Sequence, residues 1–86
     1  MKLFLTTKIW REGKHYIAYT PELDVASQGG NPDRALERLR EAVEIFLEET
    51  KRRGTLNEVL GQAGFLKKNR RWETPQISIS SFDVAV

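Results

Sequence analysis

The sequence contains no cysteine and only one histidine, His15. Without cysteine, no disulfide can stabilise the fold, and thiolate metal or redox sites are excluded. A single histidine excludes zinc sites built on histidine pairs and leaves little for general-base chemistry. The longest apolar run is far shorter than the roughly 20 residues that a membrane-spanning helix needs. Lys8 interrupts the N-terminal apolar stretch and no small-residue cleavage site follows it, which argues against a signal peptide. We therefore expect a cytoplasmic protein without membrane contact.

The length of 86 residues predicts a single domain over residues 1–86, because domains typically hold about 50–250 residues. A chain of this size buries only about 60–65% of its unfolded surface, so its core needs support. In the absence of disulfides, the natural support is self-association. The net charge of +2 comes from 14 Lys and Arg against 12 Asp and Glu, a near balance rather than the strong basic excess of a typical nucleic-acid binder.

The first thirty residues predict three β-strands in an antiparallel meander. Polar and apolar side chains alternate over residues 3–10 and β-forming residues fill 15–20, with Gly13 suited to the tight turn between them. Pro21 ends the second strand because proline cannot donate to a ladder. A short third strand is predicted over 25–29. The first strand also carries Phe4 and Trp10 on the face opposite its leucines, so we expect an uncovered sheet face that acts as an interface.

The middle of the chain predicts a long amphipathic helix. Asn31 is a typical N-cap, Pro32 suits the first helical position and Gly54 suits the C-terminal end. The apolar residues recur at the i, i+3, i+4, i+7 spacing of one helix face. They are Ala35, Leu36, Leu39, Ala42, Val43, Phe46 and Leu47. A shorter helix is predicted to follow from Thr55.

The C-terminal residues alternate again and predict a last strand over 76–82. The apolar residues then move from odd-numbered to even-numbered positions, so that Phe82, Val84 and Val86 would face away from Ile77 and Ile79. These three residues are therefore candidates for an oligomer interface. The complete pattern predicts an α+β fold of two layers. A three-stranded antiparallel meander precedes the long helix, and the short helix and the last strand follow it.

No catalytic constellation emerges from the residues, and we expect neither a catalytic site, a cofactor nor a bound metal. The acids of the long helix have basic neighbours at pairing distance and suit a solvated face. A basic run beside Trp72 is the alternative functional feature, because basic and aromatic side chains together can hold single-stranded nucleic acid. The run consists of Lys67, Lys68, Arg70 and Arg71.

One stretch resembles the HicB-like antitoxin family. It runs from Tyr16-Ile17-Ala18-Tyr19-Thr20-Pro21-Glu22-Leu23 through Ser27-Gln28-Gly29 into a helix that opens Ala35-Leu36 and continues through Glu41-Ala42 and Phe46-Leu47. The similarity covers roughly residues 8 to 50. It implies a partial RNase H-like fold and a role in a toxin–antitoxin system. The antitoxin there binds a small HicA-like mRNA-cleaving toxin and neutralises it.

Two departures refine what the resemblance implies. The sequence stops at Val86, soon after the predicted last strand, whereas full-length family members carry a DNA-binding segment there, so we expect no direct DNA binding. A two-metal nuclease site needs three or four converging acids, and the strands offer too few, so we expect no enzymatic activity. The alternatives are an orphan HicB-like domain that binds RNA or another protein, and a vestigial RNase H-like metal-dependent nuclease.

The turn after the second strand is the predicted partner contact. A toxin that holds anionic RNA needs a positive active face, and an inhibitor gains association rate and specificity from acids placed against that face. Glu22 and Asp24 are the acids best placed by rigid strands, and Tyr19 is a neighbouring aromatic anchor. For self-association we expect a homodimer or a higher homo-oligomer.

Overall fold

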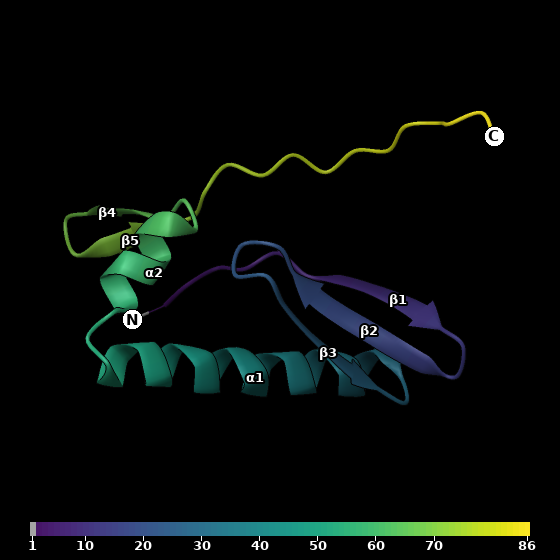
Figure 1. The fold of residues 1–86 in the computed structure, drawn as a ribbon, viewed down its shortest axis with the longest axis horizontal. Coiled ribbons are helices and arrows are strands. Elements are labelled where there is room, and N and C mark those ends of the chain that lie inside the picture. The colour runs from purple at the N-terminus through teal and green to yellow at the C-terminus, as the bar shows by residue number, and fades with distance from the viewer. Residues whose placement is uncertain (1) are drawn as a thin grey trace.

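The computed structural model describes residues 2–86 as a three-stranded sheet, two helices and a small two-stranded sheet. The strands of the first sheet are β1 (Lys8–Glu12), β2 (His15–Thr20) and β3 (Val25–Gly29). The helices α1 (Pro32–Arg52) and α2 (Leu56–Gln62) follow, and β4 (Leu66–Lys68) and β5 (Arg71–Glu73) form the second sheet. Figure 1 shows α1 as one layer beneath the three-stranded sheet. The predicted α+β class with an antiparallel meander and a long helix is confirmed.

The meander has the order β1-β2-β3, with antiparallel pairing throughout. Its second and third strands have the predicted bounds, but β1 begins at Lys8 rather than at residue 3. The cause lies at Thr6, whose backbone N–H donates to the Glu22 carboxylate at 2.7 Å instead of to a neighbouring strand. The segment 3–7 therefore leads into β1 outside any ladder.

Both ends of α1 follow the local chemistry of the sequence. The Asn31 side chain accepts a hydrogen bond from the Arg34 N–H at 2.8 Å, as an N-cap does. Gly54 adopts a φ of +75°, and the Thr55 N–H bonds back to the Thr50 carbonyl at 2.9 Å. This is the Schellman arrangement, which favours glycine at the left-handed position. Within residues 2–86, neither helix combines the length and apolarity needed to cross a membrane.

The main core lies between the sheet and α1. Its buried residues are Ala18, Ala35, Leu39 and Val43, with Leu5, Tyr16, Leu23, Val25 and Leu47 packed around them. The predicted helix stripe is thus confirmed at Leu39 and Val43, whereas Phe46 and Leu47 are half-buried. Close approach of α1 to the end of β3 depends on Gly29, because a Cβ there would stand 2.6 Å from the Ala35 backbone nitrogen.

The basic run, for which the sequence predicted no strand, forms the hairpin of β4 and β5. Asn69 and Arg70 turn the chain with φ values of 50° and 67°. These are the paired left-handed conformations of a two-residue hairpin turn, which asparagine tolerates well. Just before the hairpin, Leu60 and Phe65 are fully buried.

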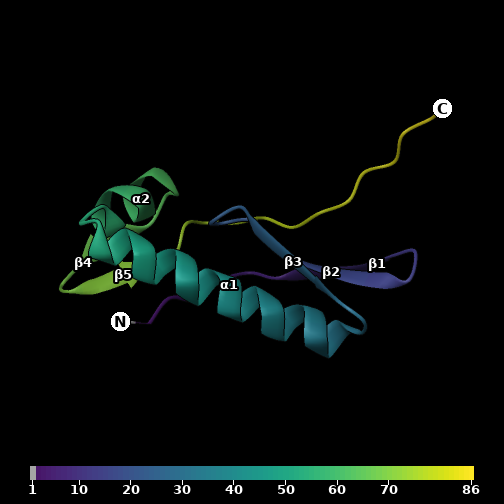
Figure 2. The same cartoon turned by 60° about the horizontal axis from the view of Figure 1, so that its bottom comes forward.

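The predicted last strand is wrong as an element of this fold. Within the described residues, 74–86 contain no helix or strand, and Figures 1 and 2 show them extending away from the sheet. Alternating polar and apolar residues show only which side chains would share a face if the segment were a strand. A strand forms only where a neighbouring strand edge can hydrogen-bond with its backbone N–H and C=O groups. The interface candidates Phe82, Val84 and Val86 all lie on this segment and are exposed.

Candidate partner-binding surface

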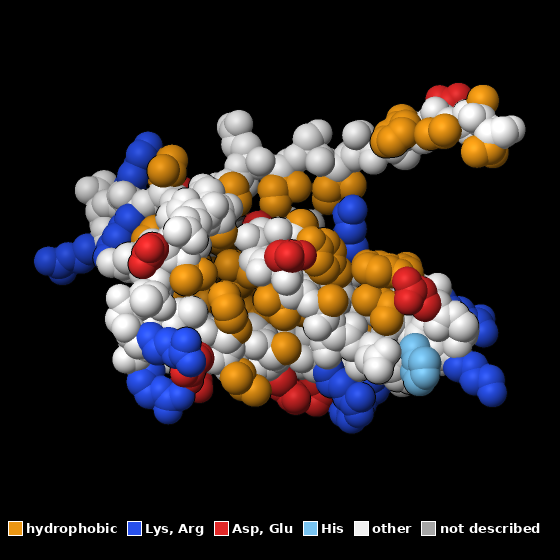
Figure 3. Space-filling view, viewed as in Figure 1, with side chains coloured by type: hydrophobic (Ala, Val, Ile, Leu, Met, Phe, Trp, Pro, Cys, Tyr) orange, Lys and Arg blue, Asp and Glu red, His pale blue; other side chains and the backbone are white. Residues whose placement is uncertain are grey.

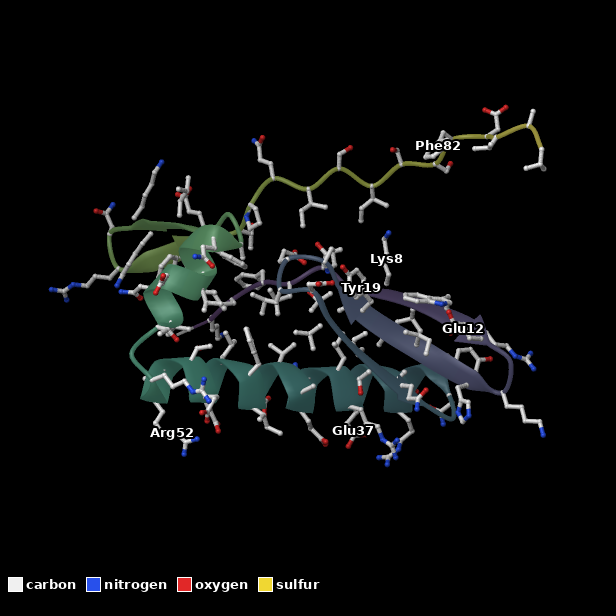
Figure 4. The ribbon with its side chains drawn as sticks, in the orientation of Figure 1. Lys8, Glu12, Tyr19, Glu37, Arg52 and Phe82 are labelled. Carbon is white, nitrogen blue, oxygen red and sulfur yellow. The ribbon has the colours of Figure 1, made fainter. Side chains whose placement is uncertain are left out.

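The three-stranded sheet has one face that no helix covers. Ala18 and Thr20 are buried toward α1, so their strand neighbours Ile17 and Tyr19 point the other way. Trp10 is the cross-strand partner of Ile17 and shares that direction. We call Trp10, Ile17 and Tyr19 the outer sheet face. Figure 4 shows Tyr19, Lys8 and Glu12 on the side of the sheet away from α1. The predicted uncovered sheet face is therefore present and carries Trp10, whereas Phe4, predicted on the same face, lies before β1 and outside the sheet.

Each aromatic side chain of the outer sheet face is held by a carboxylate. The Trp10 Nε1–H donates to Glu12 Oε1 at 2.9 Å, and the Tyr19 hydroxyl donates to Asp24 Oδ1 at 2.9 Å. The second bond is the first cause of a raised pKa of Tyr19, followed by burial and the Asp24 charge. Asp24 itself has a φ of 55°, a conformation that aspartate tolerates in turns. Rigid aromatics with fixed polar partners are typical anchors of protein interfaces.

Glu22 is directed inward rather than toward the outer sheet face. Its side chain accepts the Thr6 N–H at 2.7 Å and the Thr20 hydroxyl at 3.1 Å. The residue is only 8% exposed. Of the three residues predicted to contact a partner, the structure therefore brings Tyr19 and Asp24 together and gives Glu22 a role in joining the N-terminal segment to the turn.

The pKa of Glu22 reflects this environment. Burial raises the pKa of the carboxyl, but hydrogen bonds from the Thr6 N–H, its own backbone N–H and the Thr6 and Thr20 hydroxyls outweigh burial. The net result is a pKa lowered from the ordinary value of 4.5. Because the folded state favours the carboxylate, Glu22 stabilises the fold above its unfolded pKa. That contribution is lost as the pH falls through the folded pKa.

We expect Glu22→Gln to be less stable than the wild type at neutral pH, because the Thr6 N–H and the Thr20 hydroxyl lose a charged acceptor. The gap in melting temperature should close as the pH falls from neutral past 4.5 and through the lowered pKa of the folded carboxyl, where the wild-type side chain also becomes protonated. Thermal melts followed by circular dichroism across this pH range measure the gap. Glu37→Gln, in an exposed ion pair with Arg34, is the control and should change stability little. A gap of equal size at every pH would contradict this role of Glu22.

The basic run lies on an exposed hairpin at the opposite end of the molecule from the β1–β2 turn (Figure 1). Lys67 Nζ lies 5.6 Å from the centroid of the Trp72 ring. Lys68 Nζ lies 3.9 Å from Glu73 Oε2. Residues 51–73 contain seven of the 14 basic residues but only two of the 12 acids. The predicted nucleic-acid contact at Lys67, Lys68, Arg70 and Arg71 is not tested by this geometry and stays a prediction.

Two acids of α1, Glu37 and Glu49, form local ion pairs. Arg34 pairs with Glu37 at 3.2 Å, and Glu49 pairs with both Arg52 and Arg53. Across residues 2–86, no group of three or more His, Asp or Glu side chains is placed to hold a metal ion.

Sequence reasoning identified Trp10, Tyr19 and Asp24 but not the contributions of Ile17 and Glu12. The missed signal was the turn at Gly13, which fixes the register that places Ile17 opposite Trp10. Glu12 lies two residues from Trp10 on the same strand face, within reach of the indole. Comparison of the chain with protein-family models, curated proteins and solved structures found no match.

Proposed function

We propose that this chain is an antitoxin-like binding protein that sterically neutralises a small, basic, mRNA-cleaving toxin of the HicA-like kind. The observation that carries the proposal is the outer sheet face. Trp10 and Tyr19 lie side by side with Ile17 on adjacent strands, and each aromatic is fixed by a carboxylate 2.9 Å away. Trp10 is exposed and Tyr19 is half-buried, and aromatics so placed on a rigid sheet suit protein binding, because little side-chain entropy is lost when they are buried.

The charge distribution supports a basic partner. Residues 1–50, which contain the sheet and nearly all of α1, hold nine acids and seven basic residues, whereas the basic excess lies in residues 51–73. Glu12 and Asp24 place negative charge at the edge of the aromatic cluster. A ribonuclease must attract RNA phosphates and so presents a positive surface. Acids at the rim of an apolar centre complement such a surface and accelerate association.

The order of elements supports the same proposal. Three antiparallel strands followed by a long helix across one sheet face are what a partial RNase H-like, HicB-like domain would contain. In this arrangement the helix packs on the inner face of the sheet, and the outer sheet face and its turns remain open to a partner. The resemblance over residues 8 to 50 includes all of β1, β2 and β3 and supplies the identity of the proposed partner.

A growth-rescue assay tests the proposal. The small basic ribonuclease encoded beside this chain is expressed from an inducible promoter, with or without this protein. We expect growth arrest alone and recovery when the two are expressed together. Asp24→Lys combined with Tyr19→Ala should fold but fail to rescue, because the variant loses an anchor and reverses a charge. Continued arrest with the wild-type protein, or the lack of such a neighbouring ribonuclease, would contradict the proposed function.

A further inference from the structure

A groove remains open between α1 and the segment that leads into β1. Its volume is about 590 Å³, and its apolar lining includes Leu3, Leu5, Leu36, Leu39, Val43 and Leu47. Leu36 is 41% exposed, although it belongs to the apolar stripe of the helix. Figure 3 shows hydrophobic side chains gathered on the face between α1 and the C-terminal segment. The three strands are therefore too few to cover the apolar face of α1.

The sheet is open on the same side. In the order β1-β2-β3, β1 is an edge strand. Its outward backbone groups are available to another strand, and so are those of the segment that precedes it, except the Thr6 N–H that bonds to Glu22. One more strand alongside β1 and the segment before it, which lines the groove, would close the edge and cover the groove at once, because side chains of a strand alternate between the two faces of its sheet.

Residues 74–86, which we call the C-terminal arm, have strand patterning but form no strand in this copy. Ile77 and Ile79 share one parity, and Phe82, Val84 and Val86 share the other. Four of these five side chains are at least 67% exposed, and Ile77 is 39% exposed. The arm leaves the body at Pro75, whose Cβ lies 3.1 Å from the position of a Cβ on Gly64. This packing fixes the exit of the chain, and Figures 1 and 2 show the arm extending outward from it.

We propose that two copies of this chain exchange their C-terminal arms, each arm adding as a strand along the β1 edge of the other copy and covering its groove. Such an exchange is reciprocal and closes with twofold symmetry. Main-chain hydrogen bonds along the edge provide affinity, and the alternating side chains fill the groove and extend the opposite sheet face. Within its own copy the arm pairs with no strand. The β1 edge of a second copy provides the neighbouring strand that the pattern of the arm requires.

The extent of the exchange is sufficient for a stable dimer. Each copy donates an arm of 13 residues, 74–86, and accepts an equivalent arm on a similar number of residues. The sum falls within the roughly 20–30 residues per partner that stable interfaces use. The exchange uses the β1 edge and the groove, and the proposed toxin contact uses the outer sheet face, to which β1 contributes Trp10. The two proposals are tested separately, the exchange by the mass of the chain and the toxin contact by growth rescue.

The test is the mass of the purified full chain by sedimentation equilibrium at tens of micromolar. We expect twice the chain mass of 9.9 kDa. Ile79→Asp combined with Phe82→Asp should give the monomer mass, because aspartate on the arm cannot enter an apolar groove. Leu36→Asp, on the receiving side, should have the same effect. Circular dichroism should show an unchanged fold, since these side chains lie outside the buried core.

Ile45→Asp is the matched control. Ile45 is 67% exposed, like Ile79, but it lies outside both the arm and the groove, so this variant should remain a dimer. A monomeric wild-type chain would overturn the exchange and indicate that each arm docks on its own copy or stays free. A dimer that survives the arm substitutions, or that Ile45→Asp dissociates, would place the interface elsewhere and overturn the proposal as well.

Discussion

Replacing Phe65 with alanine should lower the free energy of unfolding by about 3–5 kcal/mol, the range for a buried phenylalanine. Phe65 is 2% exposed, and its backbone N–H closes α2 by bonding to the Leu60 carbonyl at 3.0 Å. The substitution removes a buried ring and leaves a cavity. Because small domains have only about 5–15 kcal/mol in total, the loss should be visible as a large fall in the urea midpoint.

The adjacent residue provides the matched control. Leu66 is 61% exposed, so Leu66→Ala removes apolar atoms at nearly the same point of the chain without opening a cavity. We expect a change within about 0.5 kcal/mol, as for most surface substitutions. Equal losses for Phe65→Ala and Leu66→Ala would mean that the segment between α2 and β4 packs differently from the structure described.

Gly29→Ala should destabilise the protein by about 1–3 kcal/mol or more, the cost of forcing an extra methyl group into a packed interior. The new Cβ would stand 2.6 Å from the Ala35 nitrogen and 2.8 Å from the Arg34 carbonyl carbon. Both atoms belong to the backbone of the first turns of α1, so no flexible side chain can move aside. Relief requires α1 to shift away from β3, which would loosen the main core.

Gly30→Ala is the control for this effect. A Cβ at Gly30 would meet no atom within 4 Å, so the two glycines differ in surroundings but not in chemistry. Chemical unfolding of the two variants should show a clear loss for Gly29→Ala and almost none for Gly30→Ala. If the two variants unfold together, the close contact between β3 and α1 is not the reason for glycine at position 29.

The elements with strong local signals could be predicted from the sequence. The bounds of α1 follow from Asn31, Pro32 and Gly54, each of which satisfies or ends a specific set of backbone groups. The β2 and β3 bounds follow from the β-forming residues and from Pro21. In these cases neighbouring residues alone determine the conformation, so no knowledge of distant contacts is needed.

Two of the wrong strand predictions, for residues 3–7 and for the arm, concern segments whose hydrogen-bond partners lie far away along the chain or are absent from it. Alternation extends over residues 3–7, but Glu22, sixteen residues beyond Thr6, takes the N–H that a ladder would use. The arm alternates as well, yet no strand of its own copy receives it. The β4–β5 hairpin was missed because its strands have three residues each, too few to show a period. The asparagine at its turn was the available signal.

In the candidate site, too, the residues placed by local structure could be predicted, whereas the one placed by tertiary packing could not. Tyr19 and Asp24 could be selected from the sequence because a strand end and a turn place them five residues apart, close enough for the hydrogen bond observed. Glu22 has the same charge and lies in the same turn, but its side chain faces inward. Which carboxylate faces inward depends on the position of the 3–7 segment, and that position follows from tertiary packing.

The central claim is that the outer sheet face binds a basic ribonuclease, and calorimetric titration with that ribonuclease tests it most directly. We expect saturable binding by the wild type and a loss of at least about 2 kcal/mol, roughly thirtyfold in Kd, for Trp10→Ala, as for an interface anchor. Ile45→Ala, on an exposed position of α1, should bind like the wild type. Unchanged affinity in Trp10→Ala, with its fold intact by circular dichroism, would contradict the claim.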